Sequence, residues 1–138
     1  FTPSYWSMIA FMKAVAKSGD VKTAELMYDE IMQMPEAQKH DHVPTTLMIA
    51  YSNAFKIEPK KQEDYIARTE TVFERLRDSG QKITIHAMNA RLRVYTEAYW
   101  LDDMLDVFNE YEKYGLKHNV STYNELIKAF MWCKVWDR

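Results

Sequence analysis

The residues that could hold a metal ion or attack a substrate are few and widely spaced. His40, Asp41 and His42 are adjacent, and imidazole and carboxylate groups are suitable metal ligands. No further cysteine or histidine lies nearby at the spacing of a zinc finger, so we expect this stretch to be a solvated loop. The single cysteine, Cys133, cannot form an intrachain disulfide, and we expect it to be a small buried side chain. We therefore predict no metal site and no cofactor.

Known motifs of catalytic and phosphate-binding sites are also missing. The sequence contains no glycine-rich phosphate loop, no Gly-x-Ser-x-Gly turn and no His-Glu-x-x-His pair. Glutamates and aspartates are scattered along the chain and do not form a convergent acid–base pair. The sequence therefore predicts a protein that is not an enzyme and has no small-molecule substrate.

The composition indicates which elements must position any binding residues. A chain of 138 residues that is 47% hydrophobic and 14% aromatic can fill the core of one domain. Three glycines and four prolines are too few for the tight turns of a β-sandwich, and the composition favours an all-α fold. The net charge of −2 argues against a strongly basic arm. No stretch approaches the roughly 20 apolar residues that span a bilayer, so we expect no membrane partner.

An internal repeat organises the chain. The run Met8-Ile9-Ala10-Phe11 is echoed 40 residues later by Met48-Ile49-Ala50-Tyr51 and after 40 more by Met88-Asn89-Ala90, and the next equivalent, Tyr123-Asn124, follows after 35 residues. Each unit contains two amphipathic helices, which can bury both apolar stripes only if neighbouring units stack. We expect a single right-handed α-solenoid segment over 1–138, part of a longer chain, with repeats at about 5–44, 45–84 and 85–119 and a half repeat at 120–138.

Turn residues mark the ends of these helices. Asp20 is a plausible N-cap for a helix that begins near Val21, and Gly80 and Gly115 lie where a left-handed stop is expected. Pro59 lengthens the turn within the second unit, because proline cannot continue a helix. The stretch 35–44 lengthens the first connection in the same way. Both insertions are polar, and we expect them at the edges of the stack.

Charge separates the two kinds of helix. The segments expected to form first helices carry a total of +4, and those expected to form second helices carry −8. If first helices share one face, the stack has a basic inner wall and an acidic back. A row of polar residues falls one turn after Ile9 and its equivalents, and it consists of Lys13, Asn53, Arg93 and Lys128. Such a row suits phosphate contacts, although charged helix faces are commonly just solvated.

From residue 85 onward the sequence resembles pentatricopeptide repeat proteins. The 35-residue step, the run VSTYNELIKAF at 120–130 and the run LDDMLDVFNEYEKYGLKHN at 101–119 follow that family's pattern. The first unit agrees through KAVAKSGDVKTAELMYDEI at 13–31, and the second agrees more weakly through VFERLRDSG at 72–80. Tetratricopeptide repeats are the nearest alternative, but their period is about 34.

The resemblance implies an RNA-binding surface along the first helices, on which one residue pair per repeat selects a base. The matching pair is Asn89 with Asn119, and Asn124 would pair with a residue beyond the end of the sequence. His86 and Trp6 occupy positions that could stack on a base. The first two units instead carry isoleucines, which offer no hydrogen bond to a base. These are Ile9 and Ile49, with Pro44 and Thr84 as companions.

These features lead to three functional hypotheses. The first is a mitochondrial RNA-binding or scaffolding protein, either a ribosomal subunit or an assembly factor, that contacts ribosomal RNA and neighbouring proteins. The isoleucines at two reading positions favour this hypothesis. The second is a sequence-specific factor for organellar transcripts, and the third is a protein-binding solenoid of tetratricopeptide type. The predicted RNA-contact residues are Asn89, Asn119, Asn124, Lys13, Arg93, Lys128 and His86.

Overall fold

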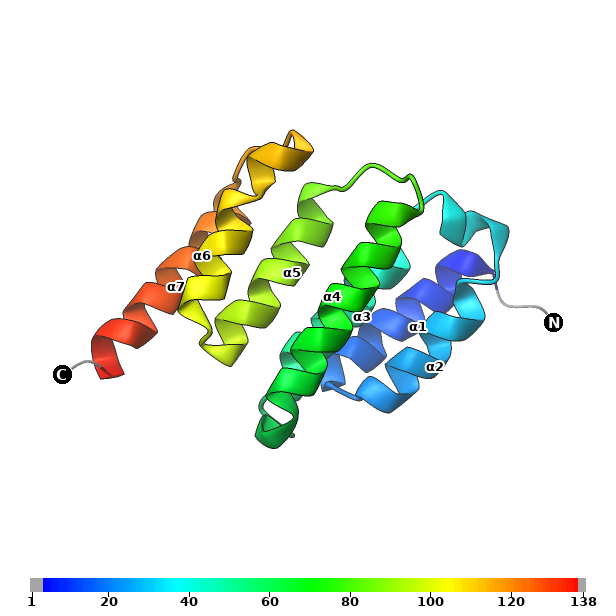
Figure 1. The fold of residues 1–138 in the computed structure, drawn as a ribbon. Coiled ribbons are helices and arrows are strands. Elements are labelled where there is room, and N and C mark those ends of the chain that lie inside the picture. Colours follow the sequence, from blue (N-terminus) through cyan, green and yellow to red (C-terminus); the bar gives the residue numbers. More distant parts are fainter. Residues whose placement is uncertain (1–3, 137–138) are drawn as a thin grey trace.

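The computed structural model describes the backbone of residues 4–136 and the side chains of residues 4–131 (Figure 1). Over these residues the chain is all-helical, as predicted, and has no strand. The α-helices are α1 (Tyr5–Ser18), α2 (Val21–Ile31), α3 (His42–Ala54), α4 (Gln62–Asp78), α5 (Ile85–Ala98), α6 (Leu101–Asn109) and α7 (Val120–Trp136). Short 3₁₀ helices add η1 (Pro35–Gln38), η2 (Pro59–Lys61) and η3 (Tyr111–Tyr114).

The α-helices pack in chain order, and helices of two kinds alternate (Figure 1). We call α1, α3, α5 and α7 the first helices and α2, α4 and α6 the second helices. Each first helix contacts the next first helix, so these four form a continuous row. Each second helix packs on the first helix that precedes it, and α2 and α4 also contact the first helix that follows. The second helices therefore cover one side of the row of first helices.

Local sequence signals set most helix ends. Asp20 caps α2 as predicted, because its Oδ1 accepts a hydrogen bond from the backbone N–H of Thr23 at 3.2 Å. Gly80 and Gly115 adopt the predicted left-handed conformation, with φ of 85° and 71°. Gly19 does the same at the end of α1, with φ of 78°. The helix ends predicted at Asp20, Gly80 and Gly115 are thus confirmed.

The start of α3 differs from the prediction. We expected the polar connection to extend to Pro44, yet α3 begins at His42 and contains Pro44 in its first turn. Proline is tolerated there, because the first N–H groups of a helix have no partner within the helix. His42 is therefore a helical residue, half buried, and is not part of a solvated loop. The two predicted insertions do separate consecutive α-helices. Each contains a 3₁₀ helix that begins with proline, η1 in the first and η2 in the second.

One apolar core runs through the stack. It contains side chains from all three helix pairs and from α7. The largest fully buried side chains include Met12, Ile31, Tyr51, Phe73, Leu92 and Tyr111. The second helices supply part of this core, and they leave the opposite side of the row of first helices uncovered. That uncovered side holds the candidate site.

Candidate ligand-binding groove

An open groove with a volume of about 790 Å³ runs across the first helices. Its lining comes from α1, α3, α5 and α7 together with Asp41, the residue that precedes α3. No second helix contributes to it. All four first helices therefore contribute to one surface, as we expected, although not every predicted residue lies on it. The lining residues are Lys13, Ala16, Lys17, Asp41, His42, Thr45, Thr46, Ile49, Asn53, His86, Asn89, Ala90, Arg93, Ser121 and Glu125.

Three residues of the predicted polar row meet in this groove. Lys13, Asn53 and Arg93 all line it, each from a different first helix. The side-chain amide of Asn53 donates to the carbonyl oxygen of Ala16 at 2.9 Å, and its oxygen accepts from Nη2 of Arg93 at 3.1 Å. Asn53 therefore links α1, α3 and α5 and fixes the direction of the Arg93 guanidinium.

The fourth member of the row, Lys128, is outside the groove lining. Its ammonium group forms an ion pair with Glu97 of α5. Lys17 lines the groove instead, and sequence analysis did not single it out. Its position four residues after Lys13 was the available signal, because residues at that spacing share a helix face.

Asn89 and Asn119 are held in a hydrogen-bond cluster with two other side chains. The amide group of Asn89 donates to Oδ1 of Asn119 at 3.1 Å. The Asn89 carbonyl oxygen accepts from the Tyr111 hydroxyl at 2.8 Å and from the Thr122 hydroxyl at 2.6 Å. Asn119 also caps α7, because its Oδ1 accepts from the backbone N–H of Thr122 at 3.0 Å. The two residues of the predicted base-reading pair thus contact each other, but their carbonyl oxygens are already occupied.

The other residues equivalent to Asn89 have different surroundings. Ile49 lines the groove, whereas Ile9 is only 3% exposed and belongs to the core. Asn124 is exposed and lies outside the groove lining. Of the four equivalent positions, the structure therefore places Ile49 and Asn89 in the groove. The companion residue Thr84 acts as the N-cap of α5, since its hydroxyl accepts from the backbone N–H of Ala87 at 3.2 Å.

Histidine and tryptophan rings gather at the N-terminal end of the groove. The Trp6 ring lies 5.4 Å from both the His40 and the His42 rings, and its side chain remains 56% exposed. Burial lowers the pKa of His42, and the nearby Lys13 charge acts in the same direction. His86 is exposed at this end of the groove. Among the described residues no group of three metal-ligating side chains is arranged to hold a metal ion.

Unpaired polar atoms are concentrated along the groove. Thr45 Oγ1, Arg93 Nε and Glu125 Oε2 are shielded from solvent and have no hydrogen-bond partner among the described residues, and all three residues line the groove. Burial raises the pKa of Glu125, although the positive charges of Lys128 and Arg93 oppose this shift. An unpaired buried polar atom costs about 1–3 kcal/mol, so a ligand that reaches these atoms after a side-chain rotation and supplies the missing partners would gain affinity. Sequence analysis missed Glu125, and no motif marks it.

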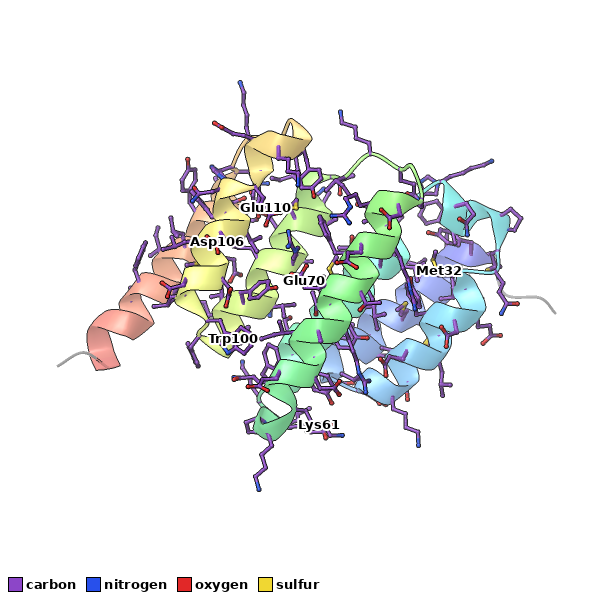
Figure 2. All side chains as sticks on the ribbon, viewed as in Figure 1. Met32, Lys61, Glu70, Trp100, Asp106 and Glu110 are labelled. Carbon is purple, nitrogen blue, oxygen red and sulfur yellow. The ribbon has the colours of Figure 1, made fainter. Side chains whose placement is uncertain are left out.

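Arg91 shows that a basic residue on a first helix need not face the groove. Its guanidinium forms ion pairs with Glu70 at 3.0 Å and Glu110 at 3.2 Å, and these two acids flank α5 (Figure 2). It also lies 4.3 Å from the centre of the Phe73 ring. Arg91 was counted in the expected basic wall, yet it joins the side that carries the second helices. Some acidic residues on the side of the second helices, such as Glu70 and Glu110, therefore stabilise the packing of the helices.

The C-terminal helix leaves an apolar stripe uncovered. Five of its large apolar side chains are between 49% and 76% exposed, namely Val120, Tyr123, Ile127, Phe130 and Met131. Trp132, Cys133 and Trp136 follow on the same helix, but their side chains lie outside the described residues. Trp100 is half buried and packs against the core.

Comparison of the sequence with models of protein families and with curated proteins gives no match. Within the described residues, no helix has both the length and the apolar character required to cross a membrane. The arrangement of the first helices and the chemistry of their groove therefore carry the functional argument.

Proposed function

We propose that this chain is a segment of a right-handed α-solenoid of the pentatricopeptide type, which binds RNA along its first helices without catalysing a reaction. The alternation of first and second helices supports the repeat architecture. The groove supports the binding role, because four successive first helices contribute to it. An extended surface of this kind suits a chain-like ligand better than a compact small molecule.

The observation that carries the proposal is the set of basic side chains within this groove. Lys13, Lys17 and Arg93 line it, and the groove acids are Asp41 and Glu125. The carboxylate of Asp41 accepts a hydrogen bond from the Thr84 hydroxyl. The ammonium groups of Lys13 and Lys17 are exposed and have no ion-pair partner among the described residues. Free cations in a groove suit the phosphates of a nucleic acid, which they bind by releasing counterions.

The cluster around Asn89 favours a scaffolding role over base-by-base reading. The oxygens of Asn89 and Asn119 accept hydrogen bonds within the chain, and Ile49 offers no polar group to a base. We therefore propose a component of the mitochondrial ribosome or a ribosome assembly factor, with ribosomal RNA and neighbouring proteins as partners. A sequence-specific transcript factor would need further reading positions, and it is the alternative within the same family.

A protein-binding scaffold of tetratricopeptide type is the second candidate. The observation that favours it is the exposed apolar stripe of α7, from Val120 to Met131. Exposed apolar patches commonly mark contact sites for proteins. This candidate predicts binding that depends on the α7 stripe and is insensitive to the groove lysines.

Salt-dependent binding of single-stranded RNA tests the proposal. The double variant Lys13→Ala/Lys17→Ala should bind RNA more weakly, and its plot of log affinity against log salt should be shallower by about 1.4, the value for two lost contacts to a single strand. The control is Lys22→Ala/Lys82→Ala, which removes two exposed lysines outside the groove. An equal salt slope in the two double variants would contradict the proposed groove interface.

Co-sedimentation with ribosomal particles tests the proposed partner and compartment. The protein should travel with a mitochondrial ribosomal subunit or its precursor, and the Lys13→Ala/Lys17→Ala variant should be released at lower salt. Sedimentation only with free transcripts would favour the sequence-specific alternative.

A further inference from the structure

Two residues that line the groove from adjacent first helices have polar atoms without a hydrogen-bond partner among the described residues. These atoms are the donor Nε of Arg93 on α5 and the acceptor Oε2 of Glu125 on α7, and both are shielded from solvent, so a ligand reaches them only after the side chains rotate. Both side chains line the groove, and no ion pair joins them in the described part of the chain. By contrast, the neighbouring Asn89 already has its carbonyl oxygen occupied by two hydroxyl groups. Unused hydrogen-bonding capacity is therefore greater at Arg93 and Glu125 than at the asparagine cluster.

The carboxylate of Glu125 would oppose RNA binding if the groove contacted phosphates alone. It would repel the phosphates that Lys13, Lys17 and Arg93 attract. A carboxylate is an acceptor of hydrogen bonds, and the N–H groups of bases are the strong donors on RNA that it can meet. Its position beside Arg93 therefore fits contact with the edge of a base.

Guanine matches this donor and acceptor pair better than the other bases do. Its Watson–Crick edge presents N1–H and N2–H side by side, which suits the two oxygens of a carboxylate, and the adjacent O6 accepts from a guanidinium. Adenine, cytosine and uracil each place an acceptor next to their donor, so only one carboxylate oxygen would be used. The hydrogen bond from Arg93 to Asn53 holds the guanidinium beside this position. Rotation about the broad terminal torsion of Glu125 can bring its free oxygen to a ligand.

We propose that Arg93 and Glu125 form a guanine-selective subsite in the groove, with Glu125 accepting from N1–H and N2–H and Arg93 donating to O6. This inference rests on the proposed RNA-binding function, which it deepens by naming the base. The residues that select the base would therefore be Arg93, one turn after Asn89 on α5, and Glu125, the residue after Asn124 on α7, instead of the two asparagines.

Binding of short RNA strands that differ at one base tests the subsite. Suitable probes are a uridine decamer with one central guanosine and the same strand with inosine, which lacks the N2 amino group, or with adenosine. The wild-type protein should prefer guanosine over inosine and adenosine by about tenfold. Glu125→Gln should abolish the preference for guanosine over inosine, because an amide cannot accept from two adjacent donors. Arg93→Lys should retain the charge but reduce discrimination between guanosine and adenosine.

A matched control separates the subsite from a general effect of charge. Glu112→Gln removes the same charge at an exposed position outside the groove, and it should leave the preference for guanosine unchanged. RNA binding with no base preference, or with a preference that Glu125→Gln leaves intact, would overturn the subsite and leave the proposed function standing. A lowered melting temperature of Glu125→Gln with an unchanged preference would assign Glu125 to helix packing instead. Absence of RNA binding by the wild-type protein would overturn both proposals.

Discussion

Two arginines on α5, only two residues apart, have opposite surroundings. Arg91 is 8% exposed, and its guanidinium contacts two carboxylates and the face of the Phe73 ring. Arg93 lines the groove, makes one hydrogen bond to Asn53 and has an unpaired Nε. An α-helix turns by about 100° per residue, so these side chains project in nearly opposite directions. The comparison separates charge that stabilises the stack from charge that remains available to a ligand.

Replacing each arginine by methionine should give the largest contrast. Arg91→Met leaves Glu70 and Glu110 without their cation inside a partly buried cluster, and we expect a loss of about 2–4 kcal/mol in the free energy of unfolding. Arg93→Met removes one hydrogen bond and one unpaired donor, so the loss should stay below about 1 kcal/mol. Urea denaturation followed by circular dichroism measures both. Equal losses would contradict the division between a structural and a ligand-facing arginine.

Substitution of Gly19 tests whether close packing of α1 on α3 supports the groove. Gly19 has a φ of 78°, and a Cβ atom there would lie 2.8 Å from Cδ1 of Ile57 and 3.2 Å from the carbonyl oxygen of Asn53. Gly19→Ala should therefore cost about 1–3 kcal/mol in unfolding free energy.

Gly115→Ala is the matched control for this substitution. Gly115 has a similar φ of 71°, but a Cβ atom added there would meet no atom within 4 Å, so only the backbone strain of about 1 kcal/mol should appear. Urea denaturation measures both variants, and equal losses would contradict the close packing of Gly19 against Ile57 and Asn53.

Local signals in the sequence predicted much of the fold. The caps, the left-handed glycines and the proline insertions depend on a few neighbouring residues, and the structure confirms them at Asp20, Gly80 and Pro59. The prediction placed the start of α3 too late, because proline is common both in loops and in the first turn of a helix, and the residues around Pro44 do not distinguish the two. Helical phase could have separated Arg91 from Arg93, since Arg91 follows the buried Met88 by three residues.

The site was less predictable than the fold, because its properties depend on partners from distant helices. Asn89 contacts Asn119, its partner in the predicted base-reading pair, but its contacts with Tyr111 and Thr122 arise only when α5, η3 and α7 assemble. The separation of Lys128 from the groove similarly depends on Glu97. Glu125 had no sequence signal, since a single glutamate on a helix is usually solvated.

The smallest expected effect is the change in unfolding free energy on replacing Glu125, which distinguishes this unpaired acid from Glu70 and Glu110, the acids paired with Arg91. Burial holds the pKa of Glu125 above the usual carboxyl value of about 4.3. The folded protein therefore binds this proton more tightly than the unfolded chain does, and the resulting stabilisation is present below about pH 4 and disappears as the pH rises through the folded pKa. Glu125→Gln should consequently raise the unfolding free energy at pH 7 by up to about 1 kcal/mol, and this gain should vanish near pH 4. The control Glu112→Gln, at an exposed site, should change stability by less than about 0.5 kcal/mol at either pH. Urea denaturation at the two pH values measures the difference, and a loss of stability at pH 7 would show that Glu125 is paired in the fold, as Glu70 and Glu110 are.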